Sequence, residues 1–143
     1  MWLRSDVERK ALFGVSETEP LPEAAYGRAV TAKVYDELYR KARRVLAAGH
    51  SAIVDAAFAE PAERAAIAQA AGNAAFHGLF LTAPLAIRVA RVGTRQGDAS
   101  DADARIARAQ EHYDLGPLNW GQVDASGTPD ETFRRARAAL GLS

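Results

Sequence analysis

The sequence contains no cysteine and no excess charge of either sign, since 18 Lys and Arg residues balance 18 Asp and Glu residues. The lack of cysteine excludes disulfides, thiolate catalysis and Cys-ligated metal centres. A net charge of 0 argues against a basic surface that coats nucleic acid. No apolar run approaches the roughly 18 residues of a membrane span, and the N-terminus has no apolar signal core. We therefore expect a cytoplasmic protein with neither membrane nor nucleic-acid partners.

Alanine and short aliphatic side chains supply most of the apolar residues, a composition that favours helices over sheets. The strongest helical pattern runs from residue 23 to residue 48, where apolar residues recur at spacings of three or four: Tyr26, Val30, Val34, Leu38, Ala42 and Val45. Prolines, glycines and capping residues predict further helices at 61–72, 84–97, 101–112 and 128–140. Ser100 with Asp103 resembles a capping box for the helix at 101–112, and Thr128 is the predicted cap of the last helix.

Short apolar runs predict buried strands at 51–55 and 77–81 and a weaker strand at 120–124. Strands that alternate with helices are typical of βαβ units, in which helices cover a mainly parallel sheet. The 143 residues include no repeat, linker or low-complexity tract. The sequence therefore predicts a single α/β domain over residues 1–143.

Acidic residues stand where a ligand would meet the predicted sheet, because open α/β sheets bind ligands beyond the carboxyl ends of their strands. Asp55 and Asp124 each end a predicted strand, and Asp6 follows the first short apolar run of the chain. A carboxylate in such a place can act as a general base on a hydroxyl or hold Mg²⁺ through water. The alternative is that each acid caps the next helix or binds loop amides, and spacing alone favours this structural role.

Arginines recur on one side of the predicted helix at 84–97, at Arg88, Arg91 and Arg95. Guanidinium groups bind phosphates through two parallel hydrogen bonds and neutralise the charge of a transferring phosphoryl group. The alternative is a solvated helix face balanced by the acids that follow it, and for an alanine-rich helix in isolation this alternative is favoured.

Four segments resemble a known family when they are taken together in their order and spacing: Leu3–Lys10, Gly49–Ala56, Arg88–Ala102 and Asp124–Glu131. They look like P-loop kinases of the gluconate-kinase, zeta-toxin and polynucleotide-kinase-like group. The likeness is greatest to the bacterial AAA-family ATPase-like kinase domain that is often fused to an aminoglycoside-phosphotransferase-like domain. The resemblance covers nearly all of the chain, and it implies ATP and Mg²⁺ as cofactors.

On the acceptor side, the resemblance implies a role for each of four residues. Asp6 matches the catalytic base that accepts the proton of the attacking hydroxyl. Arg9 matches the arginine that holds the anionic group of the phosphoacceptor, and Arg4 in the same segment is a second substrate-binding residue. The acceptor is a small molecule or is nucleotide-like. Asp55 matches the acid of the Walker-B-like strand, which holds Mg²⁺ indirectly.

On the nucleotide side, the resemblance implies an arginine-rich lid over residues 88–112. Arg91 and Arg95 match the catalytic lid arginines that close on the ATP phosphates, and Arg88 matches a nucleotide-binding arginine. The turn that contains Asp124, Ser126 and Gly127 matches the segment beside the adenine.

The chain departs from this family in one motif, because Gly-x-x-x-x-Gly-Lys-Ser/Thr occurs nowhere in it. The expected fold is a three-layer, parallel-sheet P-loop-kinase-like domain whose first strand, P-loop and first helix are missing. The strands around residues 53–54 and 79–80 would then flank an empty slot. We expect them to pair directly, to take a strand from another chain, or to leave open edges that destabilise the fold. Little or no ATP turnover is expected from this chain alone.

A fragment or shortened relative of an ATP-dependent hydroxyl kinase is thus the leading expectation. The alternative is a non-catalytic module that binds an anion or a partner through its arginines and self-associates through open sheet edges. A third reading is an α/β remnant without a ligand.

Overall fold

A computed structural model describes residues 1–94 and 97–142 of the chain. Contacts between Cα atoms divide these residues into two compact units. Unit 1 contains residues 1–74 and 97–101, and unit 2 contains residues 75–94 and 102–142. The single domain over residues 1–143 stays a prediction.

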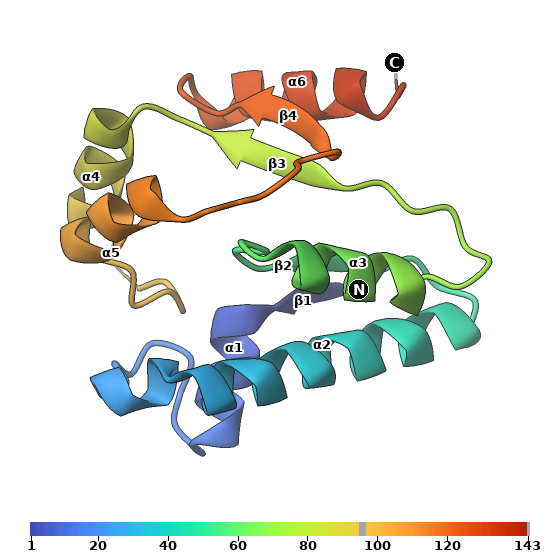
Figure 1. Ribbon diagram of the computed structural model, residues 1–143, viewed down its shortest axis with the longest axis horizontal. Helices are drawn as coiled ribbons and strands as arrows, with labels where there is room; N and C mark the ends of the chain where they lie inside the picture. Colours follow the sequence, from blue (N-terminus) through green and yellow to red (C-terminus); the bar gives the residue numbers. More distant parts are fainter. Residues whose placement is uncertain (95–96, 143) are drawn as a thin grey trace. The chain divides into compact units, whose positions relative to one another are not determined.

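Unit 1 is built from two short strands and the helices packed on them (Figure 1). Its elements are β1 (Trp2–Arg4), α1 (Ser5–Leu12), the 3₁₀ helix η1 (Glu23–Tyr26), α2 (Arg28–Ala47), β2 (Ile53–Asp55) and α3 (Pro61–Ala70). β1 and β2 pair in parallel, with Trp2 opposite Ile53 and Arg4 opposite Asp55. Both strands therefore end at the same edge of the sheet, on an arginine and an aspartate.

The core of unit 1 lies between the strands and the long helix α2. Leu3 of β1 and Val34 and Leu38 of α2 are buried, as the helical spacing predicts for the last two. Phe58 packs edge-on against Tyr35, with 5.5 Å between ring centroids, and its backbone N–H donates to the Tyr35 hydroxyl at 3.0 Å. These contacts fix the loop after β2 onto α2.

Two predictions for unit 1 are wrong in detail. The helix predicted at 23–48 begins at Arg28, because Gly27 has extended backbone angles (φ −61°, ψ 155°) and separates η1 from α2. The strand predicted as buried at 51–55 is short and open: Ile53 is 68% exposed, and its neighbour Trp2 is 63% exposed. Alternate residues of a strand point to opposite faces, and the helices of unit 1 bury the face that holds Leu3.

Unit 2 also contains a pair of parallel strands. Its elements are β3 (Leu79–Thr82), α4 (Leu85–Thr94), α5 (Ala104–Ala109), the 3₁₀ helix η2 (Gln110–His112), β4 (Gly121–Asp124) and α6 (Pro129–Ala139). β3 pairs with β4 from Leu79 opposite Gly121 to Thr82 opposite Asp124. The predicted parallel pairing is thus confirmed in each unit. The expectation that strands 53–54 and 79–80 pair directly stays a prediction.

The helix caps of unit 2 are partly as predicted. Thr128 caps α6: its hydroxyl accepts the Glu131 N–H at 3.2 Å, and the Glu131 carboxylate accepts the Thr128 N–H at 2.7 Å. The predicted cap at Ser100 is wrong, because the carboxylate of Asp103 accepts the N–H of Ile106 at 2.9 Å and α5 begins at Ala104. Among residues 1–94 and 97–142, no helix combines the length and the apolar character that crossing a bilayer requires.

Candidate functional site

Three of the four acceptor-side residues predicted from the sequence meet at the carboxyl end of β1. This strand runs directly into α1, so Asp6 lies in the first turn of the helix and Arg4 immediately precedes it. The Arg4 Nε atom donates to the Asp55 carboxylate at 3.3 Å, and this joins the ends of the two strands. Unit 1 therefore brings Arg4, Asp6 and Asp55 together at the sheet edge where parallel α/β proteins bind ligands.

The carboxyl group of Asp6 is in an unusual electrostatic environment. Burial raises its pKa above the ordinary value, and this effect outweighs a hydrogen bond from Ser100 and the nearby cations of Arg4 and Arg9, which lower it. The negative charge of Asp55 raises it further. A carboxylate whose proton affinity is raised in this way is better suited to accept a proton near neutral pH.

Arg9 is 6% exposed and lies against the segment that leads into α2. Its Nη1 atom donates to the carbonyl oxygen of Ala25 at 2.8 Å and to the Thr31 hydroxyl at 3.3 Å, and its guanidinium lies 4.9 Å from the centre of the Tyr26 ring. The Nε atom of Arg9 is buried and has no hydrogen-bond partner among residues 1–94 and 97–142. Arg9 thus holds η1 in place and keeps one donor for a further acceptor group.

Sequence reasoning missed the part that residues 97–101 play in this site. Asp98 accepts a hydrogen bond from Arg4 Nη2 at 2.8 Å, and Ser100 is hydrogen-bonded to the Asp6 side chain. Asp101 accepts from the Lys10 ammonium at 2.9 Å and from the Tyr26 hydroxyl at 2.5 Å. These contacts join residues more than 70 positions apart in sequence, so no local pattern could have revealed them.

The resemblance implies Mg²⁺, and the carboxylates of unit 1 show which kind of Mg²⁺ site the residues fit. No cluster of three or more His, Asp or Glu side chains suited to a metal occurs among the described residues. Asp55 is exposed and is already paired with Arg4. Because Mg²⁺ keeps several waters and is bound through one or two carboxylates together with substrate phosphates, a lone Asp55 fits an indirect, water-mediated role and not a protein-only site.

The predicted nucleotide-side turn lies at the end of β4 in unit 2. The Asp124 carboxylate accepts the Ser126 N–H at 2.8 Å and is paired with Arg135 at 2.9 Å. Hydrogen bonding to Ser126, together with the Arg135 cation, lowers the pKa of Asp124. The next residue, Ala125, donates its N–H to the Thr82 carbonyl at 2.7 Å. These contacts fix the start of the turn to β3 and to α6.

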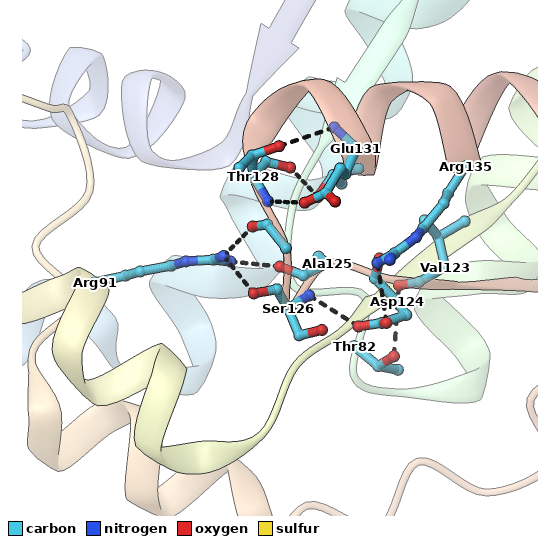
Figure 2. Close-up of polar contacts among 11 residues, drawn as sticks. Thr82, Arg91, Val123, Asp124, Ala125, Ser126, Thr128, Glu131 and Arg135 are labelled. Carbon is cyan, nitrogen blue, oxygen red and sulfur yellow. Dashed lines mark hydrogen bonds and ion pairs between the residues drawn. The ribbon is translucent and has the colours of Figure 1, made fainter.

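Arg91 binds the carbonyl oxygens of three successive residues of this turn, as Figure 2 shows. Nη1 donates to Ala125 at 2.6 Å, and Nη2 donates to Ser126 at 3.2 Å and to Gly127 at 2.6 Å. Three carbonyls that converge on one guanidinium form an acceptor surface for N–H groups, which the amino group of a purine also offers.

Of the other two arginines predicted to belong to a lid, the structure describes Arg88. Arg88 donates to the carbonyl of Ala83 at 3.1 Å and to that of Ala107 at 3.3 Å, and it forms an ion pair with Glu111. Arg88 thus connects α4 to α5 and η2 within unit 2. Arg95 lies outside the described residues.

Gly127 has a structural reason to be glycine. A Cβ atom at this position would lie 2.3 Å from a carboxylate oxygen of Glu131, the residue that completes the cap of α6. Gly127 itself supplies one of the carbonyls bound by Arg91. Gly127 therefore allows the turn and the start of α6 to approach closely.

Replacing Arg91 with alanine should destabilise the chain by about 1 kcal/mol, because the turn at 125–127 loses charge-assisted hydrogen bonds at an exposed site. Arg91→Lys should not restore the loss, since an ammonium cannot reproduce the planar fork. Urea denaturation measures both variants, with Arg108→Ala on the exposed side of α5 as the control. Equal stability of Arg91→Ala and wild type would show that these bonds contribute nothing.

Comparisons with known proteins bear on both units. The sequence model of the family described as AAA domain matches residues 1–115. Uncharacterized proteins of Mycobacterium bovis and of Mycobacterium tuberculosis are 33% identical to the chain over 140 residues, which is 92% of this chain and 27% of each relative. The chain thus spans about a quarter of the length of these relatives. No solved structure matches it.

Proposed function

This chain belongs to the AAA domain family, and on that premise we propose that it carries the acceptor side and the adenine side of a P-loop kinase. The reaction is transfer of the γ-phosphate of ATP to a hydroxyl group of a small-molecule or nucleotide-like acceptor. The observation that carries the proposal is the position of Asp6, a carboxylate of raised proton affinity beside Arg4 at the carboxyl end of β1.

In the proposed reaction, Asp6 accepts the proton of the attacking hydroxyl as the oxygen bonds to the γ-phosphorus and the bond to the β-phosphate oxygen breaks. Phosphoryl transfer depends mostly on positioning and charge neutralisation, and Arg4 and Arg9 supply cations beside the base. The Nε atom of Arg9, which has no partner in the part of the chain that the structure describes, would donate a hydrogen bond to the acceptor. ATP would bring Mg²⁺ with its phosphates, and Asp55 would hold that ion through water.

On the nucleotide side, the carbonyls of the 125–127 turn would accept hydrogen bonds from the amino group of adenine. Arg91 would then release these carbonyls and bind the ATP phosphates. Arg88 and Arg95 are proposed to complete the nucleotide side. The three guanidinium–carbonyl bonds observed for Arg91 support this proposal, because they mark a surface that already binds N–H groups.

We propose further that the complete fold is a three-layer α/β sheet in which a strand–P-loop–helix segment joins the two strand pairs. The amides and lysine of a P-loop cradle the β-phosphate, and its hydroxyl ligates Mg²⁺. This sequence contains no such motif. The parallel pairing within each unit supports the proposal, since each pair presents strand edges to which a further parallel strand could bond.

The proposal is tested by supplying the phosphate cradle. The chain alone should bind Mg-ATP weakly in isothermal titration calorimetry. Joined at its N-terminus to a strand–P-loop–helix segment with Gly-x-x-x-x-Gly-Lys-Ser, it should transfer the γ-phosphate of labelled ATP to one of three probes: glycerol, gluconate or adenosine. Tight Mg-ATP binding by the chain alone, or no turnover by a folded joined protein, would contradict the proposal.

The exposed side chains of Trp2 and Ile53 favour a second candidate, a self-associating module without chemistry. They are neighbours across the β1–β2 ladder, and both are largely exposed. Adjacent exposed apolar side chains on a sheet are typical of an interaction surface. Sedimentation velocity tests this candidate: it predicts a dimer that Ile53→Lys disrupts, and a wild-type monomer at high concentration would exclude it.

A further inference from the structure

Residues Gly97–Asp101, here called the strap, belong to unit 1 and lie beside its site. The strap contacts three residues of the segment that holds the proposed base: Asp98 binds Arg4, Ser100 binds Asp6, and Asp101 binds Lys10. A single short segment therefore reaches the base and the cations on both sides of it. No metal, ligand or partner is required for these contacts.

Asp101 is the strongest attachment point of the strap. Its carboxylate accepts from the Lys10 ammonium at 2.9 Å, from the backbone N–H of Leu21 at 3.0 Å and from the Tyr26 hydroxyl at 2.5 Å. Lys10 is 1% exposed, so its ammonium group is bonded to the Asp101 carboxylate where an exposed lysine would be bonded to water. A carboxylate with one buried cation and two further donors holds its segment in a defined place.

Ser100 is adjacent to this attachment point, and its side chain is hydrogen-bonded to Asp6. A hydroxyl that donates to a carboxylate stabilises the charged form and fixes the orientation of its oxygens. One carboxylate oxygen can then accept from Ser100 while the other is available to a substrate hydroxyl. The position of Ser100 depends on Asp101, because the two residues are consecutive and Asp101 makes three bonds to α1 and the segment after it.

We propose that the strap positions the base of the reaction, with Ser100 as the positioning residue that holds Asp6 and Asp101 as the anchor that places Ser100. This inference rests on the proposed function, in which Asp6 is the base. It adds two residues to the site for which the family resemblance gave no role. Neither residue touches the reacting atoms, so each acts through Asp6.

The test follows the titration of Asp6 by carbon NMR of its labelled carboxyl group, assigned with Asp6→Asn. Several groups face Asp6: Arg4, Arg9, Tyr26, Asp55 and Ser100. Only Ser100 is changed in the first variant. Ser100→Ala should move the titration midpoint to higher pH, with the carboxylic acid about 3- to 10-fold weaker, because the charged form loses one hydrogen bond. Ser16→Ala, in an exposed loop, should leave it unchanged.

The role of the anchor is tested by repeating Ser100→Ala in two backgrounds. In Asp36→Asn, which removes an exposed carboxylate of α2, the shift should persist. In Asp101→Asn the shift should vanish, since Ser100 is no longer held at Asp6. If Asp101→Asn does not fold, Tyr26→Phe removes one of the three bonds to Asp101 and should reduce the shift. An equal shift in every background, or no shift with Ser100→Ala, would overturn the proposal.

The titration does not depend on phosphoryl transfer, so the two proposals fail separately. If the shifts appear as expected but Asp6→Asn retains full transfer in the joined protein, the strap holds Asp6 but Asp6 is not the base. If the shifts are absent while Asp6→Asn abolishes transfer, the base assignment stands and the strap proposal is wrong.

Discussion

Asp101→Asn should destabilise the chain by about 3–5 kcal/mol, the cost expected when one partner of a buried ion pair is removed. The ammonium of Lys10 is 1% exposed, and the Asp101 carboxylate, at 2.9 Å, is its ion-pair partner. Asparagine has a similar shape but no charge, so Lys10 would remain buried without compensation. Urea denaturation at pH 7, followed by far-UV circular dichroism, measures the loss.

Two further variants separate lost charge from lost hydrogen bonds. Lys10→Met replaces the buried cation with an apolar side chain of similar length, and it should cost less than Asp101→Asn. Lys10→Met combined with Asp101→Asn should recover part of the loss, because no uncompensated charge remains. A cost for Asp101→Asn below about 1 kcal/mol, the range of exposed ion pairs, would show that this contact is not a stabilising one.

The contributions of Asp101 and Asp6 to the stability of the chain should change with pH in opposite directions. Burial raises the pKa of Asp101, but hydrogen bonds from Tyr26, Lys10 and Leu21 outweigh it, so the net pKa is lowered. The stability that Asp101 contributes is therefore present above its unfolded pKa of about 4 and is lost as pH falls through the lower folded value. The pKa of Asp6 is raised, so its contribution is present below about pH 4 and is lost as pH rises. Asp6→Asn should consequently increase stability at pH 7.

The features that the sequence predicts well are those set by local chemistry. Thr128, Pro129 and Glu131 specify the start of α6 within four residues, and the structure has that cap. The acids at the ends of β2 and β4 are predicted correctly because a strand end follows from a short apolar run. A parallel arrangement follows from the alternation of strands and helices, and both pairs are parallel.

The features that the sequence does not predict depend on distant partners. Lys10 looks like a surface lysine until Asp101, 91 residues later, is placed beside it. The helical pattern from residue 23 does not show the break at Gly27, which Arg9 helps to hold through the Ala25 carbonyl. Asp103 replaces Ser100 as the cap of α5 because Ser100 belongs to the contacts of unit 1.

Asp6→Asn in the joined protein should lower kcat for phosphoryl transfer by about 10²- to 10⁴-fold, the usual contribution of a general base. Asparagine preserves the size of the side chain and its hydrogen-bonding capacity, but it cannot accept a proton from the attacking hydroxyl. KM for Mg-ATP should change little, because the nucleotide side lies in other residues of the proposed site. The raised pKa of Asp6 also predicts that, as the pH is lowered, wild-type activity is lost at a higher pH than with an ordinary aspartate as the base.

The initial rate of γ-phosphate transfer by the joined protein, compared between Asp6→Asn and the control Asp36→Asn, shows whether Asp6 is the base. Asp36 is an exposed carboxylate of α2 in the same unit, so the control removes one negative charge without touching the site. We expect a loss of at least about 10²-fold for Asp6→Asn and a wild-type rate for Asp36→Asn. Equal rates for the two variants would contradict this expectation, because Asp6 would then not be the base.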